Sequence, residues 1–598
     1  MPDIFWLHPA LLLIFGACLL PLTRGALRSF LLLLVPTLAF AAVLVMPKGM
    51  FGVLPFLDWQ LAFGRVDNLS LVFAHIMTLM CLIGTIYGLH VRDPYEHMAA
   101  WLYVAGSLGV IFAGDFLVLF LFWELMAFSS VFLVWFRRRP QSLATGFRYL
   151  LVHTAGGLAL LVGIVLRYQA VGDISFGSLS VPNPDLATWL ILAGFLLNAA
   201  AVPLHAWLPD AYGEATVTGA VFMCAFTTKT AVYALARGFA GMEILIPLGV
   251  VMALYGVVYA VLENDARKLL AYSIISQVGY MVAGVGIGTE LAINGTCAHA
   301  FAHILYKALL FMGVGSVLYM TGTSRFSELG GLYKKMPRTL LFTLVGCASI
   351  AAFPLFSGFV SKSMIVAAAF EEHLSWAAFL LLAASAGTFL YNGLKLPYLI
   401  WFGENNCSRE AWDRAAEPPA NMQVAMALAA ALCVLVGVYT PYLYRMLPFP
   451  VTYEPYTAYH LAETLQILLF TALGFFLLIR KLTPERSISI DMDWFYRKGA
   501  AWITAIFDAW LNGLNIWAHR VIARDLTAGL AAYFKDGPAR LLMGVARPLW
   551  ELSGISTRGM DNAQARMLKR HKTGFFSAGS TAILAAALLL VLLLLVGR

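Results

Sequence analysis

Apolar residues gather in long runs that are separated by short breaks rich in charge, proline and glycine. A run of about 20 apolar residues is long enough for an α-helix to cross the hydrocarbon core of a bilayer. The breaks divide the chain into about sixteen such runs, at 4–22, 27–46, 66–89, 99–113, 116–135, 144–167, 186–208, 214–238, 243–262, 267–288, 291–319, 339–370, 374–401, 421–444, 460–480 and 577–597. This pattern predicts an all-α polytopic membrane protein with about 16 transmembrane helices.

The composition of the chain supports this prediction. Of its 598 residues, 61% are hydrophobic and only 12% are charged, and the mean hydropathy is +0.80. Soluble domains carry about twice this share of charge, so a soluble globular protein is excluded. The first run has no basic segment and no clear cleavage pattern, so we expect a retained span rather than a signal peptide.

The charges in the breaks alternate in sign along the chain. Basic groups at 24–28, 137–139, 267–268, 334–338 and 480–486 fall on one side of the membrane if every run crosses it, and acidic groups at 173–185, 290 and 371–372 fall on the other. The positive-inside rule then predicts that both termini lie on the outer side of a bacterial inner membrane. The net charge of +8 follows from this pattern and needs no nucleic-acid partner.

Residues 486–576 do not fit the spanning pattern. Apolar side chains recur there every three or four residues among polar ones, at Trp502, Ile506, Trp510, Leu514, Trp517 and Val521. This spacing predicts an amphipathic surface helix that is interrupted at Gly537 and Pro538 and leads through a basic run at 569–572 into a last span. At about 1.5 Å per residue, a helix over 491–534 reaches roughly 65 Å, which favours a brace across neighbouring spans over a simple lipid anchor.

Cofactor motifs are missing from the sequence. The seven cysteines form no CxxC pair and most lie within apolar runs, which is typical of buried structural residues rather than of an iron–sulfur cluster. The sequence has no GxxxxGK(S/T) loop and no strand-linked GxGxxG motif. We therefore expect no cofactor, no metal site and no redox or hydrolytic centre in this chain, so that any catalysis would reside on partner subunits.

Ionisable residues nevertheless interrupt the apolar runs. The sequence AHAFAHILYKALLF at 298–311 places His299, His303 and Lys307 four residues apart, so that they form one stripe on a helix. Charges also stand inside other runs, at Glu124, Lys229 and Lys362. Such groups at membrane depth cost several kcal/mol each and usually mark function.

Each of these residues also has a structural interpretation. A lysine near the end of a span can extend to the headgroups, a buried glutamate can serve a structural ion pair, and histidines can hold helices together. Their occurrence together in one chain favours a hydrated polar path between helices. Carboxylate, imidazole and amine groups suit a proton relay, because charging one group changes the protonation of its neighbour.

Two runs contain helix-breaking residues near these charges. One break is expected at VPLHAWLPDAYGEA, which contains Pro203 and Pro209, and the other at Pro354–Gly358, just before Lys362. Non-helical backbone at membrane depth is tolerated only where protein or water covers it. The breaks therefore favour the same polar path.

Five stretches in this order resemble the antiporter-like subunits of respiratory complex I and of Mrp-type cation/proton antiporters: FWELM, PLHAWLPDAY, DARKLLAYSIISQVGYM, HAFAHILYKALLF and FPLFSGFVSK. They cover roughly residues 60–405, and the amphipathic stretch with its final span resembles the lateral helix of the longest complex I member. The resemblance implies two inverted five-helix repeats, each with a broken helix. The expected segments are N-terminal helices at 1–98, a first half-channel repeat at 99–238, a second at 239–405, additional helices at 406–485, the lateral helix region at 486–576 and an anchor at 577–598.

The resemblance also implies roles for the ionisable residues. Glu124 matches the glutamate of the first half-channel, and Lys229 matches the basic group that links it to the central axis. The stripe at 299–307 matches the central relay, and Lys362 matches the terminal group of the second half-channel. His205, within PLHAWLPD, is an auxiliary candidate.

One departure from the family pattern concerns the first half-channel. The family usually carries a lysine seven positions before the histidine of PLHAWLPD, where this chain has Asn198, and the stretch at 215–223 lacks the usual prolines. An asparagine can hold water but cannot titrate. His153 on the preceding helix is a candidate substitute.

The sequence therefore predicts a proton-translocating subunit of a multi-subunit membrane complex. One alternative is the sodium/proton exchange subunit of an Mrp-type antiporter, with sodium as a second transported ion. Another is a scaffold without conduction, which Asn198 favours. A third is a proton path that energises a partner, such as a bicarbonate-uptake subunit.

Overall fold

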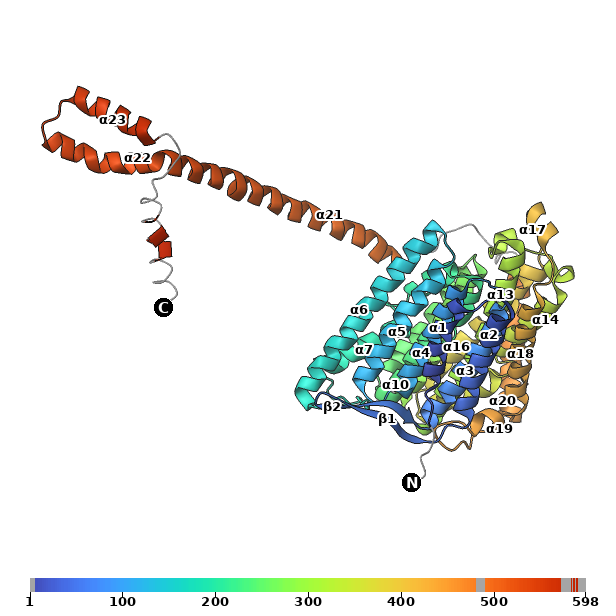
Figure 1. Ribbon diagram of the computed structural model, residues 1–598. Helices are drawn as coiled ribbons and strands as arrows, with labels where there is room; N and C mark the ends of the chain where they lie inside the picture. Colours follow the sequence, from blue (N-terminus) through green and yellow to red (C-terminus); the bar gives the residue numbers. More distant parts are fainter. Residues whose placement is uncertain (1–5, 480–489, 572–581, 583–584, 587, 590–598) are drawn as a thin grey trace. The chain divides into compact units, whose positions relative to one another are not determined.

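The computed structural model describes residues 6–479, 490–571, 582, 585–586 and 588–589. The chain forms two compact units, Met1–Asp493 and Trp494–Arg598. The first unit is a bundle of long helices that run roughly side by side (Figure 1).

The elements of the bundle follow one another in four groups. The first group is α1 Pro9–Leu19, η1 Leu20–Leu22, α2 Gly25–Leu44, β1 Gly49–Phe56, β2 Trp59–Val66 and α3 Asn68–Gly88. The second is α4 Pro94–Phe112, α5 Phe116–Trp135, α6 Pro140–Val171, α7 Leu186–Asn198, α8 Trp207–Glu214, α9 Val217–Met223 and α10 Thr227–Gly238. The third is α11 Leu245–Leu262, α12 Ala266–Ile287, α13 Glu290–Thr321, η2 Phe326–Glu328, η3 Leu332–Lys334, α14 Pro337–Ile350, α15 Phe359–Glu371, α16 Ser375–Thr388 and the π-helical segments η4 Phe389–Lys395 and η5 Tyr398–Phe402. The fourth is α17 Arg409–Arg414, α18 Ala420–Val438, α19 Pro441–Tyr444 and α20 Ala458–Leu478.

The predicted all-α membrane fold is confirmed. Among the described residues, eleven helices are long and apolar enough to cross a membrane, and three shorter apolar helices accompany them. The predicted last span at 577–597 lies almost entirely outside the described residues, so the number sixteen stays a prediction. The six predicted segments likewise stay predictions.

A β-hairpin is the element that the sequence pattern missed. Strands β1 and β2 pair antiparallel from Gly49 opposite Val66 to Phe56 opposite Trp59. The strand β1 is exposed along almost its whole length, so it lacks the alternation of buried and exposed positions that identifies a strand. The Asp115 carboxylate accepts a hydrogen bond from the Ala62 amide at 2.7 Å and thereby ties the hairpin to the start of α5.

Both predicted helix breaks are present. Residues 199–206 separate α7 from α8, and residues 351–358 separate α14 from α15. The Trp207 indole of α8 donates a hydrogen bond to the Leu197 carbonyl of α7 at 3.0 Å and thereby links the two helices across the first break. In the second, a side chain at Gly358 would collide with the Ser349 carbonyl, so only glycine fits there.

Similar backbone features recur in the two halves about 150 residues apart. Asp115 caps α5 and Asp265 caps α12, and each forms a β-bridge to a residue beyond the next helix. That next helix, α6 or α13, has 32 residues in both halves and ends at a left-handed glycine. The first break contains Ala200 at φ 56° and the second Ala352 at φ 57°. In this recurrence His153 and His303 occupy corresponding positions, and the two inverted five-helix repeats stay a prediction.

The described part of the second unit is helical. These are α21 Asp493–Ala518, the π-helical η7 His519–Leu526, α22 Thr527–Leu552 and α23 Thr557–His571. The predicted amphipathic helix is present in α21, where Trp502 and Trp510 are exposed. The predicted interruption at Gly537 and Pro538 is wrong, because α22 continues through both residues. A proline removes one backbone hydrogen bond, and here the turns on either side of it remain helical.

Close contact between α11 and α12 generates a prediction about stability. A methyl group at Gly249 would collide with the Ala283 amide nitrogen and the Gly279 carbonyl, which are backbone atoms that cannot move aside alone. We expect Gly249→Ala to destabilise the protein by about 1–3 kcal/mol, measured as a lower melting temperature of the purified protein. Gly474→Ala on α20, where no atom lies within 4 Å, is the control. Equal melting temperatures for the two variants would contradict the packing argument.

Candidate functional site

The helix α13 forms the centre of the bundle. Apolar residues occur on every side of this helix, which predicts burial on all sides, and it packs against α3, α9, α10, α12, α14, α15 and α18. His299, His303 and Lys307 are each 0% exposed. The predicted stripe is thus fully enclosed by protein.

Lys307 is held by a polar group of the neighbouring helix. Its Nζ donates a hydrogen bond to the Ser273 hydroxyl of α12 at 2.7 Å, and the Asn392 amide of η4 donates to the same hydroxyl at 2.7 Å. Close by on α12, the Gln277 amide donates to the Thr388 hydroxyl at 3.2 Å. The lysine ammonium therefore lies beside a group of polar side chains from α12, α16 and η4.

The two histidines continue the stripe in the other direction. Their ring centroids lie 6.2 Å apart, and His299 Nδ1 lies 3.3 Å from the Ser361 hydroxyl of α15. The His299 Nε2 atom and both ring nitrogens of His303 are buried without a hydrogen-bond partner among the described residues. Buried polar atoms usually have a partner, and ordered water is the common one when protein supplies none.

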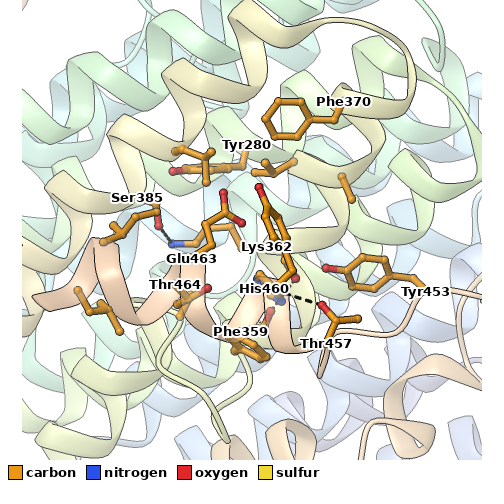
Figure 2. A pocket seen from close by; sticks show the side chains of 18 of the residues that line it. Tyr280, Phe359, Lys362, Phe370, Ser385, Tyr453, Thr457, His460, Glu463 and Thr464 are labelled. Carbon is orange, nitrogen blue, oxygen red and sulfur yellow. Dashed lines mark hydrogen bonds between the residues drawn. The ribbon is translucent and has the colours of Figure 1, made fainter.

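Lys362 follows Ser361 directly and lies at the second break. Its Nζ donates to the Ser385 hydroxyl of α16 at 2.7 Å and stands 5.5 Å from the centre of the Tyr280 ring (Figure 2). The Ile350 carbonyl, at the end of α14, is 3.5 Å away, and a cation is favoured at such a helix C-terminus. The side chain is held within the bundle, so the interpretation that it extends to the headgroups does not fit.

Lys229 occupies a similar position, just after the short gap between α9 and α10. It is 0% exposed, and its Nζ donates to the Cys224 carbonyl at 2.7 Å and to the Thr228 hydroxyl at 3.0 Å. Cys224 caps the C-terminus of α9, so this ammonium also lies at a helix end. The helix that carries it, α10, packs against α13, the helix of the central stripe.

Glu124 lies on α5 against the neighbouring helix α6. The residue is half-buried, and its carboxylate contacts Gly157, one helical turn beyond His153. The Oε1 atom is buried without a hydrogen-bond partner in the described part of the chain. The side chain forms none of the ion pairs found among those residues, so a structural ion pair is not seen.

His153 and Asn198 are neighbours. This proximity is required if His153 takes over the role of the family lysine, whose position Asn198 occupies. Both are buried, and neither ring nitrogen of His153 nor either amide atom of Asn198 has a hydrogen-bond partner within the described residues. The His153 ring packs between Tyr149 and Trp207, with ring centroids 4.2 and 4.5 Å apart.

Hydroxyl groups occupy the space between His153 and Lys229. The Tyr149 hydroxyl lies 2.8 Å from the Ser130 hydroxyl and is also a neighbour of Thr227. The Tyr103 and Thr227 hydroxyls are 2.6 Å apart, and Thr227 is two residues before Lys229. Sequence reasoning missed these groups, because serine, threonine and tyrosine in apolar helices carry no charge that singles them out.

The auxiliary candidate His205 lies in the first break and has a partner that the sequence did not reveal. Its Nε2 is 3.1 Å from the Asp491 carboxylate, which also accepts hydrogen bonds from Tyr255 at 2.5 Å and Tyr272 at 2.6 Å. Asp491 is 286 positions away in the chain, so spacing could not indicate the pair. The aspartate ties the segment before α21 to the first break.

Lys395 is a further buried cation that sequence reasoning missed. It lies in η4, and its Nζ donates to the Val261 carbonyl at 2.6 Å and to the Glu263 carbonyl at 2.8 Å. Its position within the apolar run 374–401 was the signal that could have identified it. Among the described residues, no group of three or more histidine, cysteine, aspartate or glutamate side chains could hold a metal ion.

Comparison with known proteins places this arrangement in a family. The family model described as "NADH:quinone oxidoreductase/Mrp antiporter, TM" matches residues 113–388. The chain is 30% identical to one of the Na(+)/H(+) antiporter subunits of Alkalihalophilus pseudofirmus, over 59% of this chain and 76% of that protein. It is 28% identical to hydrogenase-4 component B of Escherichia coli, over 62% of each chain, and so spans less than two thirds of that relative.

A solved structure shows the same fold over most of the chain. A chain of the membrane-bound sulfane sulfur reductase, an archaeal respiratory membrane complex, matches with a TM-score of 0.68 and 25% identity, over 90% of this chain and 99% of that chain. The five sequence stretches and the fold therefore point to the same family. The chain therefore belongs to the family of membrane subunits shared by NADH:quinone oxidoreductases and Mrp antiporters.

Proposed function

We propose that this chain translocates protons through the bundle as an antiporter-like subunit of a multi-subunit membrane complex. The observation that carries the proposal is the row of buried ionisable and hydroxyl groups that joins the two breaks. The row begins at Glu124 and His153, continues through the hydroxyls of Tyr149, Ser130, Thr227 and Tyr103 to Lys229, and reaches His303, His299 and Lys362.

The role of each group follows from its surroundings. Glu124 and His153 exchange protons at the first half, and Lys229 passes the charge to the central histidines. Lys307 holds or releases a proton beside them, and Lys362 ends the row at the second half. Water supplies the remaining bridges, because the unpartnered ring nitrogens provide hydrogen-bonding positions for it.

The chemistry of the row favours protons over sodium. Hard cations take several oxygen ligands at once, whereas this row presents amines and imidazoles that repel a cation when charged. The relative named as a Na(+)/H(+) antiporter subunit keeps sodium exchange as the second candidate. Sodium-dependent proton movement in vesicles would favour that candidate.

We also propose the partners of the chain, its membrane and its orientation there. The structural relative is part of a respiratory membrane complex, so other membrane subunits are the expected partners. The charge pattern favours a bacterial inner membrane with both termini on the outer side. The exposed apolar side chains of α21 favour contact with lipid or with a neighbouring subunit as a brace.

Replacing the carboxylate of the first half tests the proposal. We expect Glu124→Gln to lower proton flux at least about tenfold while the complex still assembles, because the amide cannot accept and release a proton. Flux is measured in vesicles that contain the reconstituted complex, with a fluorescent pH indicator inside. Unchanged flux would rule out Glu124 as a member of the path.

A pair of adjacent glycines supplies a matched control for that experiment. A methyl group at Gly157 would collide with the Glu124 carboxylate, whereas one at Gly156 meets only the flexible Leu197 side chain at 3.1 Å. We therefore expect Gly157→Ala to lower flux and Gly156→Ala to retain most of it. Equal effects would mean that general packing, not the carboxylate, determines the rate.

The replacement of the family lysine by Asn198 gives a second prediction. If His153 performs the role of that lysine, His153→Ala should lower flux, and adding Asn198→Lys should restore part of it by placing a titratable amine beside the vacated position. Flux and assembly are compared across the two single variants and the double variant. Full flux in His153→Ala would exclude this role for His153.

A further inference from the structure

A cavity of about 490 Å³ lies beside Lys362, at the end of the proposed row (Figure 2). A water molecule occupies about 30 Å³ in the liquid, so the cavity has room for more than ten of them. It is lined by residues of α12, α15, α16 and α20 and by the segment that precedes α20. The start of α20, whose residues line the cavity, lies at the end of the bundle that also carries the β-hairpin (Figure 1).

One face of α20 closes the cavity. The residues of α20 that line it in its first three turns include His460, Glu463, Thr464, Ile467 and Leu468. Their spacing of three and four places them on one side of the helix. Leu465, Leu469 and Phe470 lie on other faces and are exposed, as expected for a helix that contacts lipid. A histidine and a glutamate on the inner face of such a helix therefore require an explanation.

His460 is fixed in its place. Its ring stacks on the Phe359 ring at a centroid distance of 4.3 Å and an interplanar angle of 15°, and its Nδ1 lies 2.7 Å from the Pro455 carbonyl. The histidine thus fixes the start of α20 against the start of α15. Glu463 follows one turn further along the helix, on the face that lines the cavity with Lys362.

The ionisable groups around the cavity form a gradient of exposure. Lys362 is buried, Glu463 is half-buried, and Glu371 and Glu454 are exposed. All four line the same cavity. A single ammonium at the inner end therefore faces carboxylates that become progressively more accessible toward the surface.

We propose that this cavity is the aqueous outlet of the second half and that Glu463 is its proton-accepting group. The inference rests on the proposed function. In the outward step an N–H bond of the Lys362 ammonium breaks, water in the cavity carries the proton, and an O–H bond forms on the Glu463 carboxylate. The neutral acid then releases the proton to bulk water past Glu371 and Glu454, and the reverse sequence serves the inward direction.

Charge-preserving and charge-removing variants of Glu463 test the assignment in the full-length chain within its complex. We expect Glu463→Gln to lower proton flux at least about tenfold and Glu463→Asp to retain most of it, because a shorter carboxylate still binds a proton. Glu410→Gln, at an exposed surface ion pair on α17, is the matched control and should leave flux unchanged. In the double variant Glu463→Gln with Gln466→Glu, the carboxylate returns to α20 at a residue that does not line the cavity, so flux should stay low.

The accessibility of the cavity is tested independently of flux. In a background with the more accessible cysteines Cys18 and Cys407 changed to serine, we expect Thr464→Cys to react with a membrane-impermeant thiol reagent. An unreactive cysteine would mean that lipid or side chains fill the cavity. This result would overturn the assignment of the cavity as an aqueous outlet.

The two proposals fail in distinguishable ways. If Lys362→Ala abolishes flux while Glu463→Gln leaves it at the wild-type rate, the outlet is wrong and the proposed function stands. If neither variant changes flux in a fully assembled complex, the proposed function fails as well. Restoration of flux by Gln466→Glu would show that α20 needs only a charge, and it would also overturn the role of Glu463.

Discussion

The cost of keeping ionisable groups inside an apolar bundle governs this structure. An unpaired charge at membrane depth costs several kcal/mol, so each buried amine must find oxygen partners within the protein. Lys307 and Lys362 each use a serine hydroxyl at 2.7 Å, and Lys229 uses a carbonyl at 2.7 Å. The irregular parts of the fold supply many of these oxygens.

The interruptions between helices therefore help to stabilise the buried ammonium groups. Lys229 and Lys362 both lie at helix ends whose carbonyls are free, and Lys395 uses carbonyls at the C-terminal end of α11 in the same way. A regular helix would have used those carbonyls in its own hydrogen bonds. Glycines such as Gly157 and Gly358 allow the close approaches that bring these groups together.

The sequence predicts the parts of this arrangement that depend on local spacing. The stripe of His299, His303 and Lys307 follows from helical periodicity, and both breaks follow from proline and glycine. The groups brought together by distant segments were not predictable. Asp491 meets His205 from far along the chain, and the hydroxyls of Tyr149 and Thr227 gain significance only from their neighbours. The predicted interruption at Pro538 was wrong, because a local helix breaker does not decide the structure alone and α22 continues through this residue.

The central claim is that the two halves conduct as one path through α13. Its most direct test is proton flux in reconstituted vesicles with Lys307→Met, which removes the charge at similar side-chain length, compared with Lys334→Met at an exposed position. The account predicts that Lys307→Met lowers flux to less than about a tenth in a fully assembled complex, while Lys334→Met leaves it unchanged. Wild-type flux in Lys307→Met would contradict the account.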